Sequence, residues 1–398
     1  MFQMHKTLRS LVAQRGGLEK LMRLAPRVGP AASSNDLSST HLREIQDFGS
    51  NPGGLRMFTH LPAQASAGCP LVVVLHGCAQ TAASYDHGAG WSTLADRYGF
   101  VLLLPEQQRS NNPNGCFNWF QTGDIERGQG EALSIRQMID KMASDHGIDR
   151  SRVFVTGLSA GGAMASVMLA TYPDVFAGGA IVAGLPYGAA TSVQEAFESM
   201  FQCPARPARA WGDLVRGASP HRGPWPRVSV WHGGADTTVI PSNAREIIKQ
   251  WTDVHGVPAA AAREDVVDGF ARQVWHGASG EELIESFTIP SMAHGAPLAV
   301  GKADDQCGAA GAFLLDVGIS SSYHIAKFWG VAESLRAAAP EQGEVAPISS
   351  GVPQVIPVEP RHEEQPDLVH PQPASVSPGD IGAIIANALR AAGLMKAS

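Results

Sequence analysis

The stretch Gly157-Leu158-Ser159-Ala160-Gly161 decides the fold of this 398-residue chain. It follows a largely apolar run over 152–156, which predicts a buried strand, and precedes a small-residue run over 162–170, which predicts a helix. A strand, a sharp turn carrying serine and a helix form a nucleophile elbow, in which a strained turn exposes the serine hydroxyl. A Cβ at either flanking glycine would collide with neighbouring backbone. Ser159 is therefore the predicted nucleophile.

Two further strand-and-loop units supply partners for Ser159. A run over 228–231 leads into a turn with Asp236, and a run over 285–290 leads into a loop with His294. Their order along the chain, nucleophile then acid then base, is that of α/β-hydrolases. The sequence thus predicts an α/β-hydrolase fold with Ser159, Asp236 and His294 as the catalytic residues.

Other histidines compete for the role of base, since the chain has 14 of them. His232 shares the turn of Asp236 and is too close in sequence to be its distant partner. His276 precedes the last predicted strand instead of following it. Because the base of this fold follows that strand, the position of His294 is favoured.

Other carboxylates compete for the role of acid. Asp253 and Asp268 lie on or after a predicted helix instead of on a turn that ends a strand. Glu131 opens a long predicted helix, where we expect it to cap the helix or to pair with a nearby base. Asp236 is therefore the predicted acid.

A second loop is expected beside the nucleophile. The apolar run over 70–75 predicts a buried strand that leads into His76-Gly77-Cys78-Ala79-Gln80. In this fold such a loop and the residue after the nucleophile each present a backbone N–H group to the oxyanion of the intermediate. We expect the N–H groups of Cys78 and Ala160 to form this oxyanion hole. A thiol nucleophile at Cys78 is disfavoured because no elbow surrounds it.

The rest of the sequence alternates between predicted strands and helices. The predicted strands lie at about 70–75, 100–104, 152–156, 178–183, 228–231 and 285–290. The predicted helices lie at 91–98, 130–146, 161–171 and 242–255. Such alternation predicts an α/β architecture, with a mostly parallel sheet covered by helices on both faces.

Two segments add to this predicted core. Residues 45–60, with a turn at 51–54, predict a hairpin at the edge of the sheet. Residues 185–226 are too many for a plain connection between two strands, and they include a helix-like run over 193–200. We expect this second segment to form a small lid over the site.

The ends of the chain differ from the predicted catalytic domain, residues 41–336. Residues 1–40 form a basic, loosely amphipathic extension, and the nine prolines of residues 337–379 are typical of a disordered linker. In residues 380–398, Asp380 precedes apolar residues that share one face of a short predicted helix. This amphipathic helix either docks on the protein's own core or tethers the protein to a partner or a hydrophobic granule surface.

Composition narrows the class of protein. A formal net charge of −7 argues against nucleic acid as a partner, because phosphate binding depends on clustered Lys and Arg. The sequence holds no apolar run long enough for a transmembrane segment and no Cys/His spacing of a zinc site, and we expect no Sec signal peptide. Five cysteines leave one unpaired, which suits a reducing compartment. We therefore expect a cytoplasmic protein.

Several short strings occur in order along residues 45–335. They are His76-Gly-Cys-Ala-Gln-Thr81, Pro105-Glu-Gln107, Cys116-Phe-Asn-Trp-Phe120, Gly157-Leu-Ser-Ala-Gly-Gly162, Trp231-His-Gly-Gly-Ala-Asp236, Gly318-Ile-Ser-Ser321 and Phe328-Trp-Gly330. Together they resemble the poly(3-hydroxybutyrate) (PHB) depolymerase family of esterases, which is related to feruloyl and acetylxylan esterases.

The resemblance implies a serine esterase that acts on a hydrophobic ester, either short hydroxyacid esters or the polyester itself, without a cofactor. It implies the same triad and oxyanion loop, with Trp119 and Gln80 at the substrate groove. Secreted relatives make an extracellular location the alternative to the cytoplasm. They also leave open a disulfide between Cys78 and Cys116, which both lie in loops above the predicted site.

Three alternatives to PHB depolymerisation remain at this point. A feruloyl or acetyl-type carbohydrate esterase would use the same triad on another ester. An acyltransferase would use it too, with an acceptor alcohol in place of water. A granule-surface structural protein with a vestigial core is disfavoured because every predicted triad position is intact.

Overall fold

The computed structural model describes residues 41–332, apart from the side chain of Ala261. The basic extension at 1–40, the proline-rich linker at 337–379 and the amphipathic helix at 380–398 lie outside the described residues. The predictions for these three segments therefore stay predictions.

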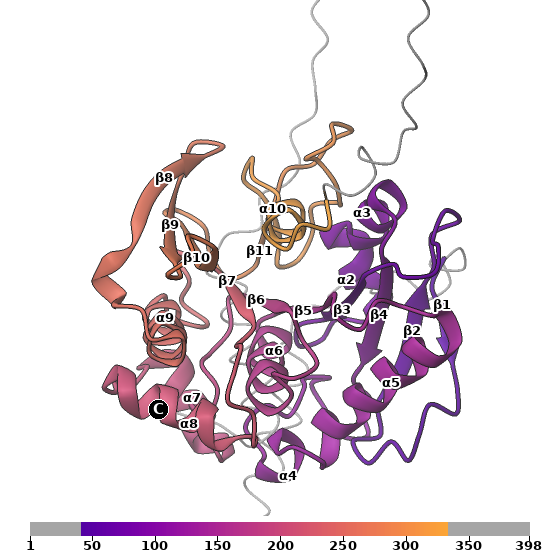
Figure 1. Ribbon diagram of the computed structural model, residues 1–398, viewed down its shortest axis with the longest axis horizontal. Coiled ribbons are helices and arrows are strands. Elements are labelled where there is room, and N and C mark those ends of the chain that lie inside the picture. The colour runs from indigo at the N-terminus through magenta and orange to yellow at the C-terminus, as the bar shows by residue number, and fades with distance from the viewer. Residues whose placement is uncertain (1–40, 333–398) are drawn as a thin grey trace, which may run out of the picture. The chain divides into compact units, whose positions relative to one another are not determined.

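A ten-stranded sheet forms the centre of the described region, in the order β1-β2-β4-β3-β5-β6-β7-β10-β9-β8 (Figure 1). Its strands are β1 (Arg43–Ile45), β2 (Arg56–His60), β3 (Leu71–Leu75), β4 (Val101–Glu106), β5 (Val153–Leu158), β6 (Gly178–Val182), β7 (Arg227–Gly233), β8 (Arg263–Val267), β9 (Phe270–His276) and β10 (Glu282–Ile289). The strands from β4 to β10 in this order pair in parallel. The predicted mostly parallel sheet is thus present.

The helices follow the strands in alternation. They are α2 (Ala82–Ala89), α3 (Trp91–Tyr98), α4 (Thr122–Ile125), α5 (Gly130–His146), α6 (Ala160–Thr171), α7 (Val193–Phe201), α8 (Ala208–Gly217), α9 (Ser242–His255) and α10 (Ser321–Phe328), with a 3₁₀ turn η1 (Ala259–Ala261). The four predicted helices are confirmed to within one residue. A separate pair, β11 (Ala296–Leu298) and β12 (Leu314–Asp316), lies outside the main sheet.

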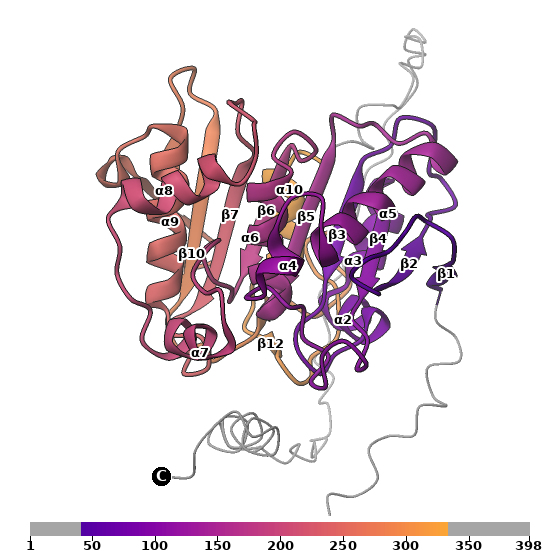
Figure 2. The same cartoon turned by 90° about the horizontal axis from the view of Figure 1, so that it is seen from below.

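Helices cover both faces of the sheet (Figures 1 and 2), and alternate residues of the central strands pack against opposite layers. In β3, Leu71, Val73 and Leu75 pack in one hydrophobic cluster with residues of α5, α6 and α9. Val72 and Val74 pack in a second cluster with residues of α2, α3 and α10. Because β3 is buried on both sides, its sequence is a continuous apolar run.

Both edges of the sheet are antiparallel. At one edge β1 pairs with β2, as the hairpin prediction required, and an Asn51 C=O to Gly54 N–H bond of 3.0 Å closes the turn between them. At the other edge β9 and β8 extend the sheet beyond β10. These two strands were not predicted, because β8 reads Arg-Glu-Asp-Val-Val and its first four residues are exposed. An exposed strand lacks the apolar run on which the prediction depended.

The segment for which a lid is predicted, 185–226, forms α7 and α8. Helix α8 packs along α9, where the Arg216 guanidinium forms an ion pair with the Asp253 carboxylate. Helix α7 lies near the loop that follows β7, since the Ile240 N–H donates to the Met200 C=O at 2.9 Å. Most of the segment is thus bound to the flank of the core, and a covering role for α7 stays a prediction.

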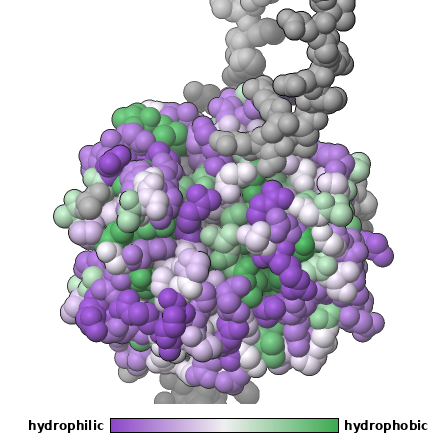
Figure 3. Space-filling model, in the orientation of Figure 1, coloured by the Kyte–Doolittle hydropathy of each residue, from purple (hydrophilic) through white to green (hydrophobic). Residues whose placement is uncertain are grey.

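Among residues 41–332, few large apolar side chains are exposed. In the view of Figure 3, hydrophobic colour gathers where Figure 1 places the hairpin of β8 and β9. Val266 in this hairpin is 70% exposed, the largest value among the bulky apolar residues described. Across residues 41–332, no helix has the length and apolar character needed to cross a membrane.

Candidate active site

The turn after β5 holds Ser159 in a strained backbone conformation, with φ 58° and ψ −115°. The glycines beside it make this turn possible. A Cβ on Gly157 would lie 2.3 Å from the Gly161 C=O oxygen, and one on Gly161 would lie 2.2 Å from that of Leu75. The Ser159 N–H donates to the Val182 C=O at 2.9 Å, which ties the turn to β6. The elbow predicted from the glycine spacing is therefore present.

One series of hydrogen bonds joins the three residues predicted to be catalytic. The His294 Nε2 lies 2.9 Å from the Ser159 Oγ, and the His294 Nδ1 lies 2.7 Å from the Asp236 Oδ2. Parallel pairing of β7 with β10 places the loops of Asp236 and His294 side by side. His294 is 135 positions from Ser159 and 58 from Asp236, yet the three residues meet at the carboxyl ends of β5, β7 and β10, which belong to the parallel part of the sheet.

The surroundings of Asp236 favour its ionised form. Its Oδ1 accepts the N–H groups of Thr238 and Val239, at 2.8 and 2.9 Å. Although burial by itself would raise the pKa of Asp236, hydrogen bonds from His232 and His294 hold that pKa well below its usual range. An ionised carboxylate here orients the His294 ring and stabilises an imidazolium.

The rival residues have other partners. Asp253 pairs with Arg216, and Asp268 lies 2.7 Å from the His324 Nε2. The His232 Nε2 donates to the Val239 C=O at 2.7 Å and lies 3.4 Å from the Asp236 Oδ2. His232 therefore contacts the acid and not the nucleophile. His276 lies in β9 and lines a cavity with Pro224 and Glu281, away from Ser159.

The loop after β3 presents backbone donors beside the elbow. Among the described residues, neither the Cys78 N–H nor the Ala160 N–H donates to a protein acceptor, which leaves both available to an oxyanion. The His76 ring fixes this loop, because its Nδ1 bonds the Gly77 C=O at 2.8 Å and its Nε2 accepts the Gln107 N–H at 3.1 Å. Burial lowers the pKa of His76 to about 4, so the ring stays neutral.

A disulfide between Cys78 and Cys116, with an S–S distance of 2.07 Å, anchors the same loop. This pairing is the one that the sequence left open. The remaining described cysteines, Cys69, Cys203 and Cys307, are buried and unbridged. The crosslink connects the predicted oxyanion donor to the loop that precedes α4.

We expect the role of Cys78 in hydrolysis to depend on its backbone and not on its thiol. Under reductant, Cys78→Ala should keep most esterase activity, whereas Cys78→Pro, which lacks the N–H, should lose it. Oxidised wild type should exceed Cys78→Ala in unfolding free energy by about 4 kcal/mol, the chain-entropy value for closing a loop of this size. Steady-state kinetics and urea denaturation measure the two effects. Complete inactivation of a folded Cys78→Ala protein would assign the thiol a chemical role.

Glu131 lies at the centre of a buried polar network that the sequence did not predict. Its side chain is 0% exposed. One carboxyl oxygen accepts the Gln107 Nε2–H at 2.5 Å and the Asn118 Nδ2–H at 2.9 Å, and the other accepts the Asn118 N–H at 2.9 Å. Burial raises the pKa of Glu131 to about 8. The expectation that Glu131 caps its helix or pairs with a base was wrong, since Asp124 accepts the Glu131 N–H at 3.2 Å and no base is among its partners.

This network joins the two loops that flank the oxyanion donor. Gln107 bonds both His76, through its N–H, and the Cys116 C=O, through its Nε2. Glu131 therefore fixes the loop at 107 and the loop at 116–118 at once. Gln107 and Asn118 lie within two of the strings that carry the family resemblance, and that is the signal which could have found them.

Replacing Glu131 by glutamine should destabilise the protein. Each carboxyl oxygen of Glu131 accepts an N–H group and can do so in either protonation state. In Glu131→Gln one of these oxygens becomes an NH₂ group, which is a donor. At least one buried N–H group would then face another donor. The expected loss is about 1–3 kcal/mol in the free energy of unfolding, together with a lower kcat. Urea denaturation checks the first effect, with Glu126→Gln on an exposed side chain as the control. Equal stability of the two variants would contradict the role of the network.

The two residues predicted to line the substrate groove differ in exposure. The Trp119 side chain is 7% exposed and packs in the core, edge-to-face with Phe120 at 5.4 Å between ring centroids. The Gln80 Oε1 accepts the Gly77 N–H at 2.9 Å, and Gln80 also lines a cavity beside the loop. Little of Trp119 is therefore free to contact substrate in this structure, whereas Gln80 faces open space. Among residues 41–332, no three His, Cys, Asp or Glu side chains are grouped to hold a metal ion.

Comparison with known sequences places this geometry in context. Residues 56–269 match a family described as "Esterase PHB depolymerase". The chain is 49% identical over 315 residues to Poly(3-hydroxyalkanoate) depolymerase C of Paucimonas lemoignei, a match that covers 79% of this chain and 75% of the other. It is 32% identical over 279 residues to the Acetylxylan esterase of Coprinopsis cinerea, covering 68% and 72% of the two chains. It is 34% identical over 267 residues to Feruloyl esterase B of Neurospora crassa, covering 64% and 88%.

A solved structure shares the fold. The acetyl xylan esterase from Aspergillus awamori superposes with a TM-score of 0.61 at 25% sequence identity. The match covers 73% of this chain and 100% of that one. The α/β-hydrolase arrangement predicted from the elbow and from the order of the three residues is thus confirmed.

Proposed function

The chain belongs to the PHB depolymerase family of esterases and is a carboxylic ester hydrolase, and on this premise we propose that it hydrolyses poly(3-hydroxybutyrate) or its oligomers through Ser159, His294 and Asp236. The proposal rests on one observation above all. The Ser159 hydroxyl, the His294 ring and the Asp236 carboxylate form an unbroken hydrogen-bonded series beside two unoccupied backbone donors.

The acylation step follows from this arrangement. His294 removes the proton of the Ser159 hydroxyl as its oxygen attacks the ester carbonyl, and Asp236 stabilises the imidazolium that forms. The N–H groups of Cys78 and Ala160 donate to the developing oxyanion. Loss of one such donor costs roughly 3–4 kcal/mol of transition-state stabilisation in other hydrolases. His294 then protonates the leaving alcohol, and the acyl group stays on Ser159.

Deacylation repeats the chemistry with water. His294 takes a proton from a water molecule, the resulting hydroxide attacks the acyl-serine, and the proton returns to the Ser159 oxygen. Both half-reactions use the same oxyanion donors. Every proton transfer is made by this chain's own residues, and none requires an added group.

A substrate panel tests the choice of ester. The 49% identity to a poly(3-hydroxyalkanoate) depolymerase favours a polyester over the esters named for the acetylxylan and feruloyl relatives. We expect kcat/KM for a 3-hydroxybutyrate trimer to exceed that for methyl ferulate and acetylated xylan by at least tenfold, measured by titrating released acid. A preference for either carbohydrate ester would overturn the polyester proposal. Product analysis with added alcohol separates hydrolysis from acyl transfer.

The C-terminal segment gives a second prediction. A proline-rich spacer before an amphipathic helix would let that helix bind a hydrophobic granule without constraining the catalytic domain. Deleting residues 340–398 should spare hydrolysis of soluble p-nitrophenyl esters and sharply reduce co-sedimentation with polyester granules. Equal granule binding by both forms would refute the tether. The cytoplasmic location, with its extracellular alternative, stays a prediction.

A further inference from the structure

Phe313 lies beside the predicted base in a backbone conformation that a bulky residue rarely adopts. Its ring centroid is 5.9 Å from that of His294, and the two ring planes are inclined by 75°. This is the edge-to-face arrangement that aromatic pairs prefer. The backbone of Phe313 has a φ of 63°, in the left-handed region that favours glycine. A residue strained in this way persists where its surroundings impose it, and such residues gather at functional sites.

Backbone contacts hold Phe313 in this conformation. The turn over 311–314 is closed by two hydrogen bonds between its first and last residues, of 2.9 and 3.1 Å. The Phe313 C=O accepts the Ala296 N–H at 2.9 Å, two positions after His294. At Gly295, which lies between them, a Cβ would come within 2.7 Å of the Phe313 C=O oxygen. The segment that carries His294 and the segment that carries Phe313 are therefore fixed to each other at this point.

His294 loses one of its two hydrogen bonds in the course of the proposed reaction. In the resting enzyme its Nε2 accepts the Ser159 hydroxyl, and its Nδ1–H donates to Asp236. In the acyl-enzyme the Ser159 oxygen carries the acyl group in place of its proton. The Nε2 of a neutral imidazole is an acceptor and an ester oxygen has no proton to donate, so the bond between them is lost. The Asp236 bond and the Phe313 contact then remain to hold the ring.

We propose that Phe313 positions the His294 ring in the acyl-enzyme, so that the His294 Nε2 can take a proton from water. The inference rests on the proposed triad of Ser159, His294 and Asp236. The proton of water moves to Nε2 as the water oxygen bonds the acyl carbon, and it passes to the Ser159 oxygen as the bond from that oxygen to carbon breaks. Phe313 takes no part in these transfers and is a positioning residue. Deacylation should therefore depend on its ring more than acylation does.

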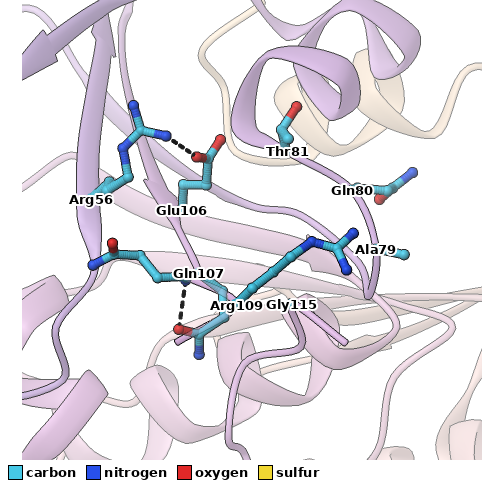
Figure 4. Close-up of a pocket in the computed structure, with 9 residues that line it drawn as sticks. Arg56, Ala79, Gln80, Thr81, Glu106, Gln107, Arg109 and Gly115 are labelled. Carbon is cyan, nitrogen blue, oxygen red and sulfur yellow. Dashed lines mark hydrogen bonds and ion pairs between the residues drawn. The ribbon is translucent and has the colours of Figure 1, made fainter. Parts of the chain in front are cut away.

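The loop that carries Cys78 is held by contacts that do not involve Phe313. The His76 ring and the disulfide to Cys116 fix this loop. Gln80 of the same loop lines the cavity shown in Figure 4, and Phe313 is not among the residues that line it. Removing the Phe313 ring should therefore leave the predicted oxyanion donor in place and act through His294.

The test is Phe313→Gly, which removes the ring and suits a φ of 63°. We expect kcat for a p-nitrophenyl ester to fall roughly tenfold or more, because misplacing a reacting group by about 1 Å can cost roughly 100-fold. The ratio kcat/KM, which reports acylation, should fall by less than about threefold, so KM falls together with kcat. Stopped-flow mixing should show a burst of p-nitrophenol stoichiometric with the enzyme, because the acyl-enzyme accumulates. Phe313→Tyr, which keeps an aromatic ring, should recover most of kcat.

A matched control removes a side chain at another positive φ. Asp47 is exposed in the loop between β1 and β2 and has a φ of 57°. Asp47→Gly should leave kcat and KM unchanged. Phe313→Leu keeps apolar volume beside His294 and decides by the same comparison of kcat with kcat/KM if Phe313→Gly does not fold.

The other outcomes separate the role of Phe313 from the triad itself. Equal losses in kcat and kcat/KM without a burst, or an unchanged kcat, would overturn the positioning role and leave the proposed function standing. A folded His294→Ala protein that turns over ester at the wild-type rate would instead overturn the triad on which the proposed function depends.

Discussion

Ser159→Ala is expected to reduce kcat for ester hydrolysis by roughly 10⁵ to 10⁶-fold, because the acyl-enzyme has no other oxygen on which to form. The same change should abolish covalent labelling by a fluorophosphonate. Alanine lacks only the hydroxyl oxygen of serine. Its Cβ needs no more room at a φ of 58° than the Cβ of serine does. The fold should therefore be retained, as circular dichroism and the melting temperature will show.

A matched control separates this effect from the loss of any serine. Ser279 is exposed in the turn between β9 and β10, far along the chain from the elbow. Ser279→Ala should label and turn over substrate at the wild-type rate. Persistent labelling of Ser159→Ala at the wild-type rate would show that another residue is the nucleophile.

His294→Ala should be about as damaging as the loss of Ser159, since the members of such a series act as a unit. Asp236→Asn should lower kcat by roughly 10⁴-fold, because the amide stabilises the wrong tautomer of the His294 ring and cannot balance an imidazolium. Rates on a p-nitrophenyl ester measure both. His87→Ala, on an exposed residue of α2, serves as the control and should leave kcat unchanged.

The neighbouring histidine sharpens this second prediction. His232 also contacts Asp236, at 3.4 Å, yet its ring bonds Val239 and not Ser159. We expect His232→Ala to cost less activity than His294→Ala. The reverse order would mean that the base has been assigned to the wrong ring.

The elbow and the main strands could be predicted because their sequence signals are local. The two glycines stand within five residues of each other around Ser159, although a Cβ on Gly161 would meet the Leu75 C=O of β3, and β3 is apolar throughout because both of its faces are covered. The order of Asp236 and His294 along the chain then followed from the fold. The structure places these residues together as that order required.

The parts that escaped prediction depend on long-range contacts. Glu131 is buried by loops that approach from 107 and from 118, and no pattern near Glu131 specifies those partners. The strand β8 escaped because its first four residues are exposed, so it has no apolar run to mark it as a strand. The position of α8 follows from its packing on α9, which the length of the 185–226 segment could not indicate.

The charged outer strand β8 affects whether molecules of this protein can pair through their sheets at high concentration. β8 ends the sheet, and an unpaired strand edge is a template on which another chain can add a strand. Arg263, Glu264 and Asp265 occupy this edge and are exposed. Their side chains disfavour edge-to-edge pairing, so this edge of the sheet resists adding a strand from another molecule when the protein is concentrated.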